Sequence, residues 1–421
     1  MTEALLAPAP RFVPLRQSSA FELLCACSVA HPNLEQIERI QAHAEHGGAQ
    51  SGYWWEEFRS LAEHHGVLPL AAYNLIEHTL NLPPETRRSL TTLYAENLRR
   101  NLWFAAELLR ILRHFEVRQI RALPYKGPVL AQAAYGDLGL RSFSDLDILI
   151  APSDFFRAKQ ALAEIEYHPA HQLAPAVERL WLRAGYEQSF DGPAGKNLLE
   201  LQWRLLPYFY AIDPNFAHFR FDDLWARTGR IELGASTTPA QIRTSTHAAA
   251  DSTPCLSPED SLLAVCLHAA KHLWTRLIWV ADIAESLRAP QIDLTVVISR
   301  ARSLGIARIL GVSFRLAEDL LGATIPPAAR EVMEGDPEVP RLAQHSASRL
   351  QRAASYDFES TDYFRQTARL RERRADRGRY LWRLAWTPGP KDVEAVQLPG
   401  GMFSLYPAIR IARLLKKLAC G

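Results

Sequence analysis

The stretch KGPVLAQAAYGDLGLRSFSDLDILI, residues 126–150, decides the fold that this sequence predicts. A glycine turn at Gly127 is followed by a helical pattern at 129–135. A Gly-Asp-Leu-Gly turn at 136–139 then leads into the apolar segment 146–150, which predicts a strand. Another apolar, strand-like segment precedes this stretch. The predicted order of elements is therefore strand, helix, turn and strand. This order indicates a unit that mixes helix and sheet.

Two acids, Asp145 and Asp147, stand at the start of the predicted strand. Alternate side chains of a strand share a face, so both carboxylates point the same way while Leu146 and Ile148 point into the core. Their repulsion is costly unless a cation is shared, and paired oxygen ligands suit a Mg²⁺ ion that carries substrate phosphates. A solvated strand end with two surface acids is the alternative. The upstream Lys-Gly turn and the Arg-x-x-Ser before Asp145 favour the metal site.

The same stretch resembles the catalytic signature of the polymerase-β-like nucleotidyltransferase superfamily, and most closely that of a bacterial family of uncharacterised nucleotidyltransferases. In that superfamily a glycine turn opens a helix, an Asp-x-Asp strand follows, and a later strand supplies a third carboxylate. The resemblance implies an α+β, mostly helical fold with a small mixed sheet of this type, flanked by helical regions. It also implies an enzyme that uses Mg²⁺ (or Mn²⁺) and a nucleoside triphosphate as substrate.

Glu200 is the candidate for the third carboxylate. In the segment NLLELQW, residues 197–203, apolar residues alternate with Glu200 and Gln202, which predicts a strand with its acid facing away from the core. An ordinary exposed strand acid is the alternative. The resembled family has a His two residues after this acid, whereas this chain has Gln202.

By resemblance, Asp145, Asp147 and Glu200 are the metal ligands and the catalytic acids. Asp145 and Asp147 would hold Mg²⁺, and Glu200 would serve as a further metal ligand or as the base that orients or deprotonates the acceptor. The acceptor would attack the α-phosphorus of the triphosphate in line, and pyrophosphate would leave.

Four residues are candidates to bind the triphosphate: Lys126, Gly127, Arg141 and Ser144. The turn at Gly127 lets backbone amides approach a phosphate, and a helix N-terminus favours an anion. Pro128 departs from the superfamily pattern, because it has no amide proton where Gly or Ser is usual. The spacing from the glycine to the first acid is long, but it is similar to that of abortive-infection toxin-type nucleotidyltransferases, which have a comparable Arg-x-Ser-x-Asp-x-Asp motif.

A second polar constellation lies in the segment HAAKHLWTRLIWVAD, residues 268–282. If the segment is helical, steps of three, four and seven residues bring its polar side chains and Trp279 to one side. The toxin-type relatives have a Lys and a later Asp in a helix beside the site. Lys271 and Asp282 resemble that pair, and Lys271 would neutralise triphosphate charge. The alternative is a buried helix in which Lys271 pairs with Asp282 and His268 is a core residue whose hydrogen bonds are satisfied.

The pattern along the chain predicts four regions. Residues 1–115 form an N-terminal helical region and 116–231 the catalytic core. Residues 232–258, rich in Ala, Ser, Thr and Pro, form a linker or long loop, and 259–421 a C-terminal helical region with a basic tail.

Periodicity and capping residues predict several helices. A long amphipathic helix is expected over 85–115. Its predicted apolar face consists of Leu98, Leu102, Ala105, Leu109 and Leu112. Ser153 is expected to cap a helix over 152–166, and Ser257 a helix that runs through Lys271.

Composition predicts a globular protein: of 421 residues, 48% are hydrophobic and 22% charged, which excludes disordered, collagen-like and coiled-coil classes. The charge is uneven, because residues 341–421 carry 16 Lys and Arg against 7 Asp and Glu. This basic C-terminus could attract an anionic partner, although such a run is more often a solvated helix face. The arginines at 369–379 are interpreted as such a face, and a basic helix at 408–418 is expected to dock on its own domain.

The five cysteines have no metal-ligand spacing and predict reduced thiols in a cytoplasmic protein. No secretory signal pattern is expected at the N-terminus, where prolines interrupt the chain. No apolar run approaches the ~20 residues that span a bilayer, so no transmembrane insertion is expected.

The acceptor is not identified by the sequence, and a peptide, a sugar and RNA are the candidates. Relatives beside peptide natural product clusters make a modified peptide a candidate by resemblance alone. Two other functions are compatible with the same residues. The Asp-x-Asp metal site could serve glycosyl or phosphoryl transfer from an activated nucleotide donor. Alternatively, Pro128 and Gln202 could mark a catalytically inactive nucleotide-binding module.

Overall fold

The structure is a computed structural model that describes residues 19–48, 52–206, 219–234, 252–289, 291–354, 360–387 and 400–420, with a few positions between the last segments. It is mostly helical and contains a small mixed sheet, which confirms the predicted α+β class. None of the described helices combines the length and the apolar composition that a membrane span requires.

Five strands form the main sheet, in the order β1-β2-β5-β4-β3. Their bounds are β1 Ala122–Pro124, β2 Leu146–Ile150, β3 His168–Pro169, β4 Glu187–Gly192 and β5 Gly195–Gln202. β2 and β5 are parallel and the other neighbours are antiparallel. The two predicted strands are confirmed, although β5 begins two residues before the predicted segment and ends before Trp203.

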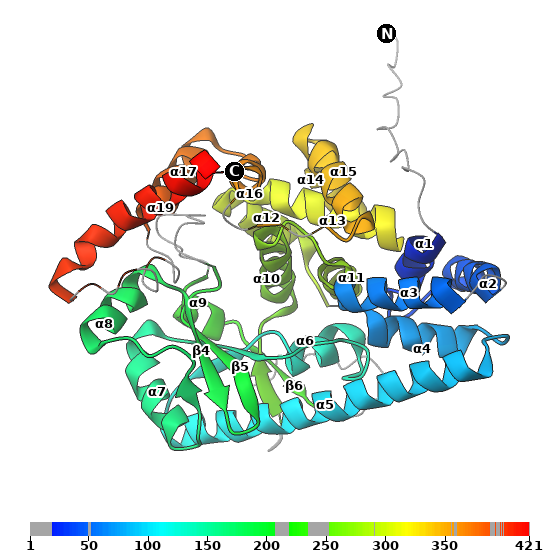
Figure 1. Ribbon diagram of the computed structural model, residues 1–421, viewed down its shortest axis with the longest axis horizontal. Helices are drawn as coiled ribbons and strands as arrows, with labels where there is room; N and C mark the ends of the chain where they lie inside the picture. Colours follow the sequence, from blue (N-terminus) through cyan, green and yellow to red (C-terminus); the bar gives the residue numbers. More distant parts are fainter. Residues whose placement is uncertain are drawn as a thin grey trace, which may run out of the picture.

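The two faces of the sheet pack against different helices. Ile148 and Leu201 belong to a core cluster shared with the long helix α5 (Pro84–Val117) and with α7 (Phe155–Ala163). Leu149 points to the opposite face and belongs to a second cluster that includes α10 (Pro258–Lys271). Figure 1 accordingly shows α5 below the sheet and the C-terminal helices above it. Because side chains alternate, Asp147 lies on the face that looks toward α10.

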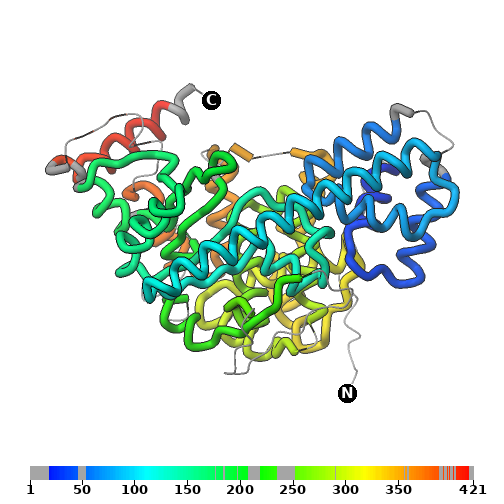
Figure 2. The backbone as a smooth tube through the Cα atoms, turned by 90° about the horizontal axis from the view of Figure 1, so that it is seen from below, coloured from blue at the N-terminus to red at the C-terminus, as the bar shows by residue number. Residues whose placement is uncertain are grey.

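The buried face of α5 differs from the predicted apolar face. Leu102 is 43% exposed, whereas Asn97 and Asn101 are buried. Their side-chain amides donate hydrogen bonds of 2.6–2.8 Å to backbone oxygens of the segment 138–141. A polar helix face that binds backbone carbonyls is invisible to hydrophobic periodicity, which explains the error. Figure 2 shows α5, in light blue to cyan, crossing the molecule from the blue N-terminal helices toward the green part of the chain.

Helices from both ends of the chain share one core. The N-terminal helices are α1 Ser19–Ala26, α2 Leu34–Gly48, α3 Gly52–His65 and α4 Leu68–His78. The C-terminal region continues after α10 with α11 Leu277–Leu287, α12 Leu294–Leu304, α13 Ala307–Leu321, α14 Pro327–Glu334, α15 Glu338–Gln351, α16 Thr361–Arg369, α17 Arg374–Trp386 and α19 Tyr406–Cys420. A single cluster of buried side chains includes residues of α1 to α4 and of α10 to α15.

Several predicted boundaries can be compared with the structure. The Ser257 side chain accepts a hydrogen bond from the amide of Asp260 and caps α10, as predicted. The predicted Ser153 cap is wrong, because Pro152 opens a short 3-10 turn, η2 (Pro152–Asp154), that encloses Ser153 before α7 begins.

Part of the predicted linker forms a strand. β7 (Ser252–Cys255) pairs with β6 (Gly229–Glu232) in an antiparallel ribbon, and residues 235–251 lie outside the described residues. The predicted docking of the basic tail helix is confirmed. α19 packs on α17, and Arg410 donates to the backbone oxygen of Leu384.

Candidate functional site

Asp147 and Glu200 lie side by side on neighbouring strands. The parallel register of β2 and β5 pairs Asp147 with Glu200 and, one step earlier, Leu146 with Leu199. Asp145 directly precedes β2 and lies two residues from Asp147. The sheet therefore brings together the three acids that the sequence proposes from distant positions.

A fourth carboxylate, Glu187, joins this group, although no motif in the sequence points to it. It lies at the start of β4, opposite Gln202 of β5. Its charge raises the pKa of both Asp145 and Glu200. The turn-forming sequence DGPAG at 191–195 is a hairpin signal that could have placed Glu187 beside β5.

Burial and mutual repulsion make two of these acids weak. Burial, followed by the charges of Glu187 and Asp147, raises the pKa of Glu200 to about 9. Burial, followed by the charge of Asp147, raises the pKa of Asp145 to about 6. The site thus has more carboxylates than Lys126 alone can balance, a condition that a bound cation relieves.

Lys126 and Gln202 place donors among the carboxylates. The Nζ atom of Lys126 lies 2.6 Å from Oδ1 of Asp147. The side-chain amide of Gln202 donates to Asp147 and Glu200 at 3.0 Å each and to Glu187 at 3.3 Å. The Tyr125 hydroxyl donates to Oε1 of Gln202 at 2.6 Å. This bond sets the amide nitrogen toward the acids, so Gln202 has a defined place in the site.

The carboxylates fit a metal that arrives with its substrate. Among the described residues, no three His, Cys, Asp or Glu side chains form a group that could hold a metal ion. Mg²⁺ is commonly bound through one or two carboxylates, with substrate phosphates and water completing the coordination. Asp145 and Asp147 supply such a pair; burial, followed by the charge of Asp147, raises the pKa of Asp145, and a cation would offset that charge.

Gly127 adopts the backbone conformation that its turn requires. Its φ of +56° is in the left-handed region, and a Cβ there would lie 3.3 Å from the backbone oxygen of Asp145. The predicted helix follows as α6 (Pro128–Leu130) and a π-helical turn, η1 (Ala131–Tyr135). Pro128 suits the first helical position, where no amide donor is needed. The turn thus lies directly against the start of the Asp-x-Asp strand, while Ser144 is exposed.

Arg141 forms a buried ion pair with Asp282. Its Nε donates to Oδ1 at 2.8 Å and its Nη2 to Oδ2 at 2.9 Å, and the Tyr135 hydroxyl donates to Oδ1 at 2.8 Å. The structure thus joins Asp282 to Arg141, whereas the sequence analysis considers a pair with Lys271. The ion pair ties α11 to the segment that leads into Asp145. Phosphate binding by Arg141 and Asp282 stays a prediction.

The sequence predicts one helix over 268–282, but the structure contains two helices there, with a turn between them. α10 ends at Lys271, Leu273 and Trp274 have a φ of +50°, and α11 begins at Leu277. Lys271 donates to the hydroxyl of Tyr186 at 3.1 Å. Tyr186 precedes Glu187, so the end of α10 lies beside the carboxylate group.

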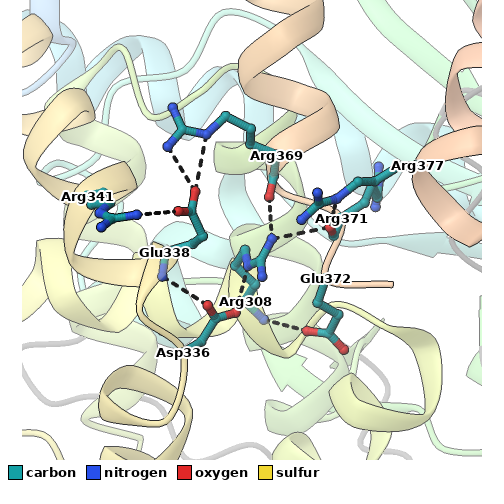
Figure 3. A network of polar contacts seen from close by, with 8 residues as sticks. All are labelled: Arg308, Asp336, Glu338, Arg341, Arg369, Arg371, Glu372 and Arg377. Atoms are coloured by element: carbon teal, nitrogen blue, oxygen red, sulfur yellow. Dashed lines mark hydrogen bonds and ion pairs between the residues drawn. The ribbon is translucent and has the colours of Figure 1, made fainter. Parts of the chain in front are cut away.

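The arginines at 369–379 form a solvated face only in part: Arg373 and Arg374 are exposed, whereas Arg369, Arg371 and Arg377 belong to a network of polar contacts (Figure 3). Arg308 donates to the backbone oxygens of Arg369 at 2.6 Å and Arg371 at 3.2 Å. The side chain of Arg369 donates to Glu338 at 2.8 Å, and Arg371 is only 1% exposed. Local acids and carbonyls therefore engage much of this positive charge, and an anionic partner of the C-terminus stays a prediction.

The raised pKa of Glu200 predicts a pH-dependent effect of Glu200→Gln. The folded-state pKa of about 9 lies above the ordinary value of 4.5, so ionisation of Glu200 opposes folding and stability is lost as pH rises between these values. Removing this titration is expected to raise the melting temperature of the variant relative to the parent, increasingly so from about pH 5 to pH 9. Thermal melts without divalent cations measure this difference. The exposed Glu166→Gln is the control, and a constant difference across the pH range contradicts the prediction.

Comparison with known proteins identifies the family of this site. Residues 52–322 match the model of a family described as uncharacterised nucleotidyltransferase. The match covers more than half of the chain, including the carboxylate strands and α10 to α13. No curated protein and no solved structure matches the chain. The chain therefore belongs to this family of uncharacterised nucleotidyltransferases.

Proposed function

We propose that the protein is a Mg²⁺-dependent nucleotidyltransferase that moves a nucleoside monophosphate from a nucleoside triphosphate to an acceptor. One observation carries the proposal: in a chain of this family, Asp147 and Glu200 are paired on adjacent parallel strands, with Asp145 beside them. The order of glycine turn, Asp-x-Asp strand and neighbouring acid resembles the polymerase-β-like superfamily and its toxin-type members. We therefore propose that the chain is related to this superfamily.

Two lysines lie near the carboxylates of the proposed site. Asp145 and Asp147 would hold Mg²⁺ or Mn²⁺, which when bound offsets charge on the phosphate oxygens. Lys126 lies against Asp147, and Lys271 lies against Tyr186, next to Glu187. Both lysines would balance triphosphate charge, and the turn at Gly127 would offer backbone amides near the same strand end.

The reaction forms a bond between an acceptor atom and the α-phosphorus and breaks the bond to the bridging oxygen, so that pyrophosphate leaves. Glu200 takes the proton that the acceptor loses. Burial and the charges of Glu187 and Asp147 raise its pKa to about 9, so Glu200 is protonated at neutral pH until a bound cation lowers that pKa, and the ionised carboxylate then serves as the base. Gln202, held by Tyr125, positions Glu200 through its amide.

Nucleotide binding without turnover is a second candidate function, and the structure contains an observation that favours it. Donors from Lys126 and Gln202 already satisfy the oxygens of Asp147 and Glu200 that face them. Pro128 also lacks the amide that the superfamily uses at this position. A site stabilised in this way could bind a nucleotide and not process it.

The acceptor and the compartment belong to the same proposal. A peptide natural product is the acceptor class to test first, followed by a sugar and RNA. Cys25, Cys27, Cys255 and Cys266 are buried free thiols. Free thiols suit a reducing compartment, so we place the activity in the cytoplasm.

The test combines each of the four common nucleoside triphosphates and a set of nucleotide sugars with Mg²⁺, Mn²⁺ or a chelator. Peptide, sugar and RNA acceptors are added in turn. Calorimetry follows binding, and mass spectrometry follows products. Metal-dependent binding of a triphosphate, with pyrophosphate release and a product heavier by one nucleoside monophosphate, is the expected result.

Other outcomes identify the alternatives. Consumption of a nucleotide sugar alone indicates glycosyl transfer, and a product heavier by one phosphoryl group indicates phosphoryl transfer. Metal-dependent binding with no product from any acceptor identifies a binding module. Absence of binding to every donor overturns the proposal.

A further inference from the structure

Three aromatic rings cluster where α10 ends and α11 begins. The rings of His272 and Trp279 are stacked, with centroids 4.7 Å apart and planes at 25°. The ring of His268 lies 4.8 Å from that of His272 and meets the Trp279 ring edge-on at 5.7 Å. Each of the three side chains is partly exposed. We call these three residues the ring cluster.

The ring cluster lies beside the proposed phosphate site. Lys271, between the two histidines in sequence, reaches Tyr186, which precedes the acid Glu187. Burial, followed by the charge of Lys126, lowers the pKa of His268 well below its ordinary value. The cluster is thus close enough to Lys126 for their charges to interact. The Lys271–Tyr186 contact and the influence of Lys126 on His268 therefore place the rings near the carboxylates.

The arrangement of α11 connects the rings to the Asp-x-Asp strand. Trp279 and Asp282 are one helical turn apart on α11. The buried guanidinium of Arg141 holds Asp282 by two hydrogen bonds. Arg141 lies in the segment that precedes Asp145. The ion pair therefore ties the helix that carries Trp279 to the segment that carries Asp145.

The chemistry of the rings indicates what they bind. Burial, followed by the charge of Lys271, lowers the pKa of His272, so both imidazoles are neutral at physiological pH and offer flat, uncharged faces. Flat neutral rings next to lysines suit a ligand with a planar aromatic part joined to an anion. A nucleoside triphosphate has this form, and stacking on aromatic side chains is a common way to hold its base.

We propose that the ring cluster, His268, His272 and Trp279, holds the nucleobase of the triphosphate donor while the carboxylates and lysines receive its phosphates. The inference rests on the proposed function and assigns the base-binding part of that site. The cluster binds by stacking and therefore contributes to affinity for nucleotides, but not to affinity for a phosphate chain without a base.

The experiment compares two ligands in the presence of Mg²⁺: each nucleoside triphosphate and inorganic tripolyphosphate. Binding is measured by calorimetry for the parent, Trp279→Leu, Trp279→Phe and Lys126→Met. Trp279→Leu is expected to weaken nucleotide binding by about 5- to 150-fold, the usual effect of losing one stacking ring, and to change tripolyphosphate binding by less than about 2-fold. Trp279→Phe should recover part of the loss, and Lys126→Met should weaken both ligands.

The controls separate the inference from the proposed function. Trp382→Leu changes a tryptophan that is 64% exposed on α17 and should leave both affinities unchanged. Melting curves show whether each variant is folded. Equal loss of both ligands in Trp279→Leu, or no loss of either, overturns the ring assignment and leaves the proposed function standing. If the parent binds neither ligand, the proposed function fails and the ring assignment fails with it.

Discussion

Asp147→Asn is expected to reduce nucleotidyl transfer by about 1000-fold or more while the protein stays folded. The substitution keeps the shape of the side chain but removes the charge that pairs with Lys126 and that would hold the metal. Loss of a metal ligand at a charged transition state costs several kcal/mol, and each 1.36 kcal/mol is about tenfold in rate. The rate of pyrophosphate release at saturating triphosphate and Mg²⁺ measures the effect.

The fold should tolerate this change. Glu200 also contributes to the raised pKa of Lys126, so the lysine keeps a carboxylate neighbour in the variant. Burial lowers the pKa of Lys126, but the charge of Asp147, followed by those of Tyr125 and Glu200, outweighs burial. Glu166→Gln, which neutralises an exposed carboxylate after α7, is the matched control and should be fully active. Activity of Asp147→Asn close to that of Glu166→Gln would show that the Asp-x-Asp pair is not the catalytic metal site.

Asp282→Ala is expected to destabilise the protein by about 3–5 kcal/mol. The substitution leaves the buried guanidinium of Arg141 without its bidentate partner and the Tyr135 hydroxyl without its acceptor. An unpaired charge in the interior costs far more than the loss of an exposed pair, because water cannot replace the missing partner. At about 2–4 °C per kcal/mol for a large domain, the melting temperature should fall by roughly 6–20 °C.

Two comparison variants test the cause of this loss. Asp282→Asn keeps the side-chain shape and one oxygen acceptor, so it should lose less stability than Asp282→Ala. Glu331→Ala removes the partner of Arg302 in an exposed pair and should cost no more than about 1 kcal/mol. Melting followed by circular dichroism gives all three values. Equal decreases in melting temperature for Asp282→Ala and Glu331→Ala would mean that the buried ion pair contributes no more to stability than an exposed one.

Local patterns in the sequence were sufficient for the strands and for the first acids of the site. The apolar alternation at 146–150 and around Glu200 predicts β2 and β5, because side-chain period 2 is a local property of a strand. The cap at Ser257 is equally local, since its bond spans three residues. These features needed no knowledge of neighbouring elements.

Features that depend on a distant partner were not predictable in the same way. Asn97 and Asn101 are buried because the carbonyls of a turn come to meet them, and no periodicity of α5 reveals this. Glu187 joins the site through the β4–β5 hairpin register, which places it opposite Gln202. The hydrophobic pattern of an element predicts which of its faces is buried, but it does not predict which polar group of another element will contact that face.

The sequence by itself therefore determined the α+β class, the Asp-x-Asp strand, the glycine turn before it and the acid Glu200. The strands and the turn follow from backbone propensities and from the alternation of side chains along single elements, whereas the α+β class and the role of Glu200 follow from the family resemblance. Only the tertiary structure decided that Asp147 and Glu200 are neighbours, that Arg141 holds Asp282, and that the chain turns between α10 and α11. Each of these depends on charge and hydrogen-bond pairing between segments far apart in sequence. Such pairing exists only after packing has brought the segments together and excluded water from between them.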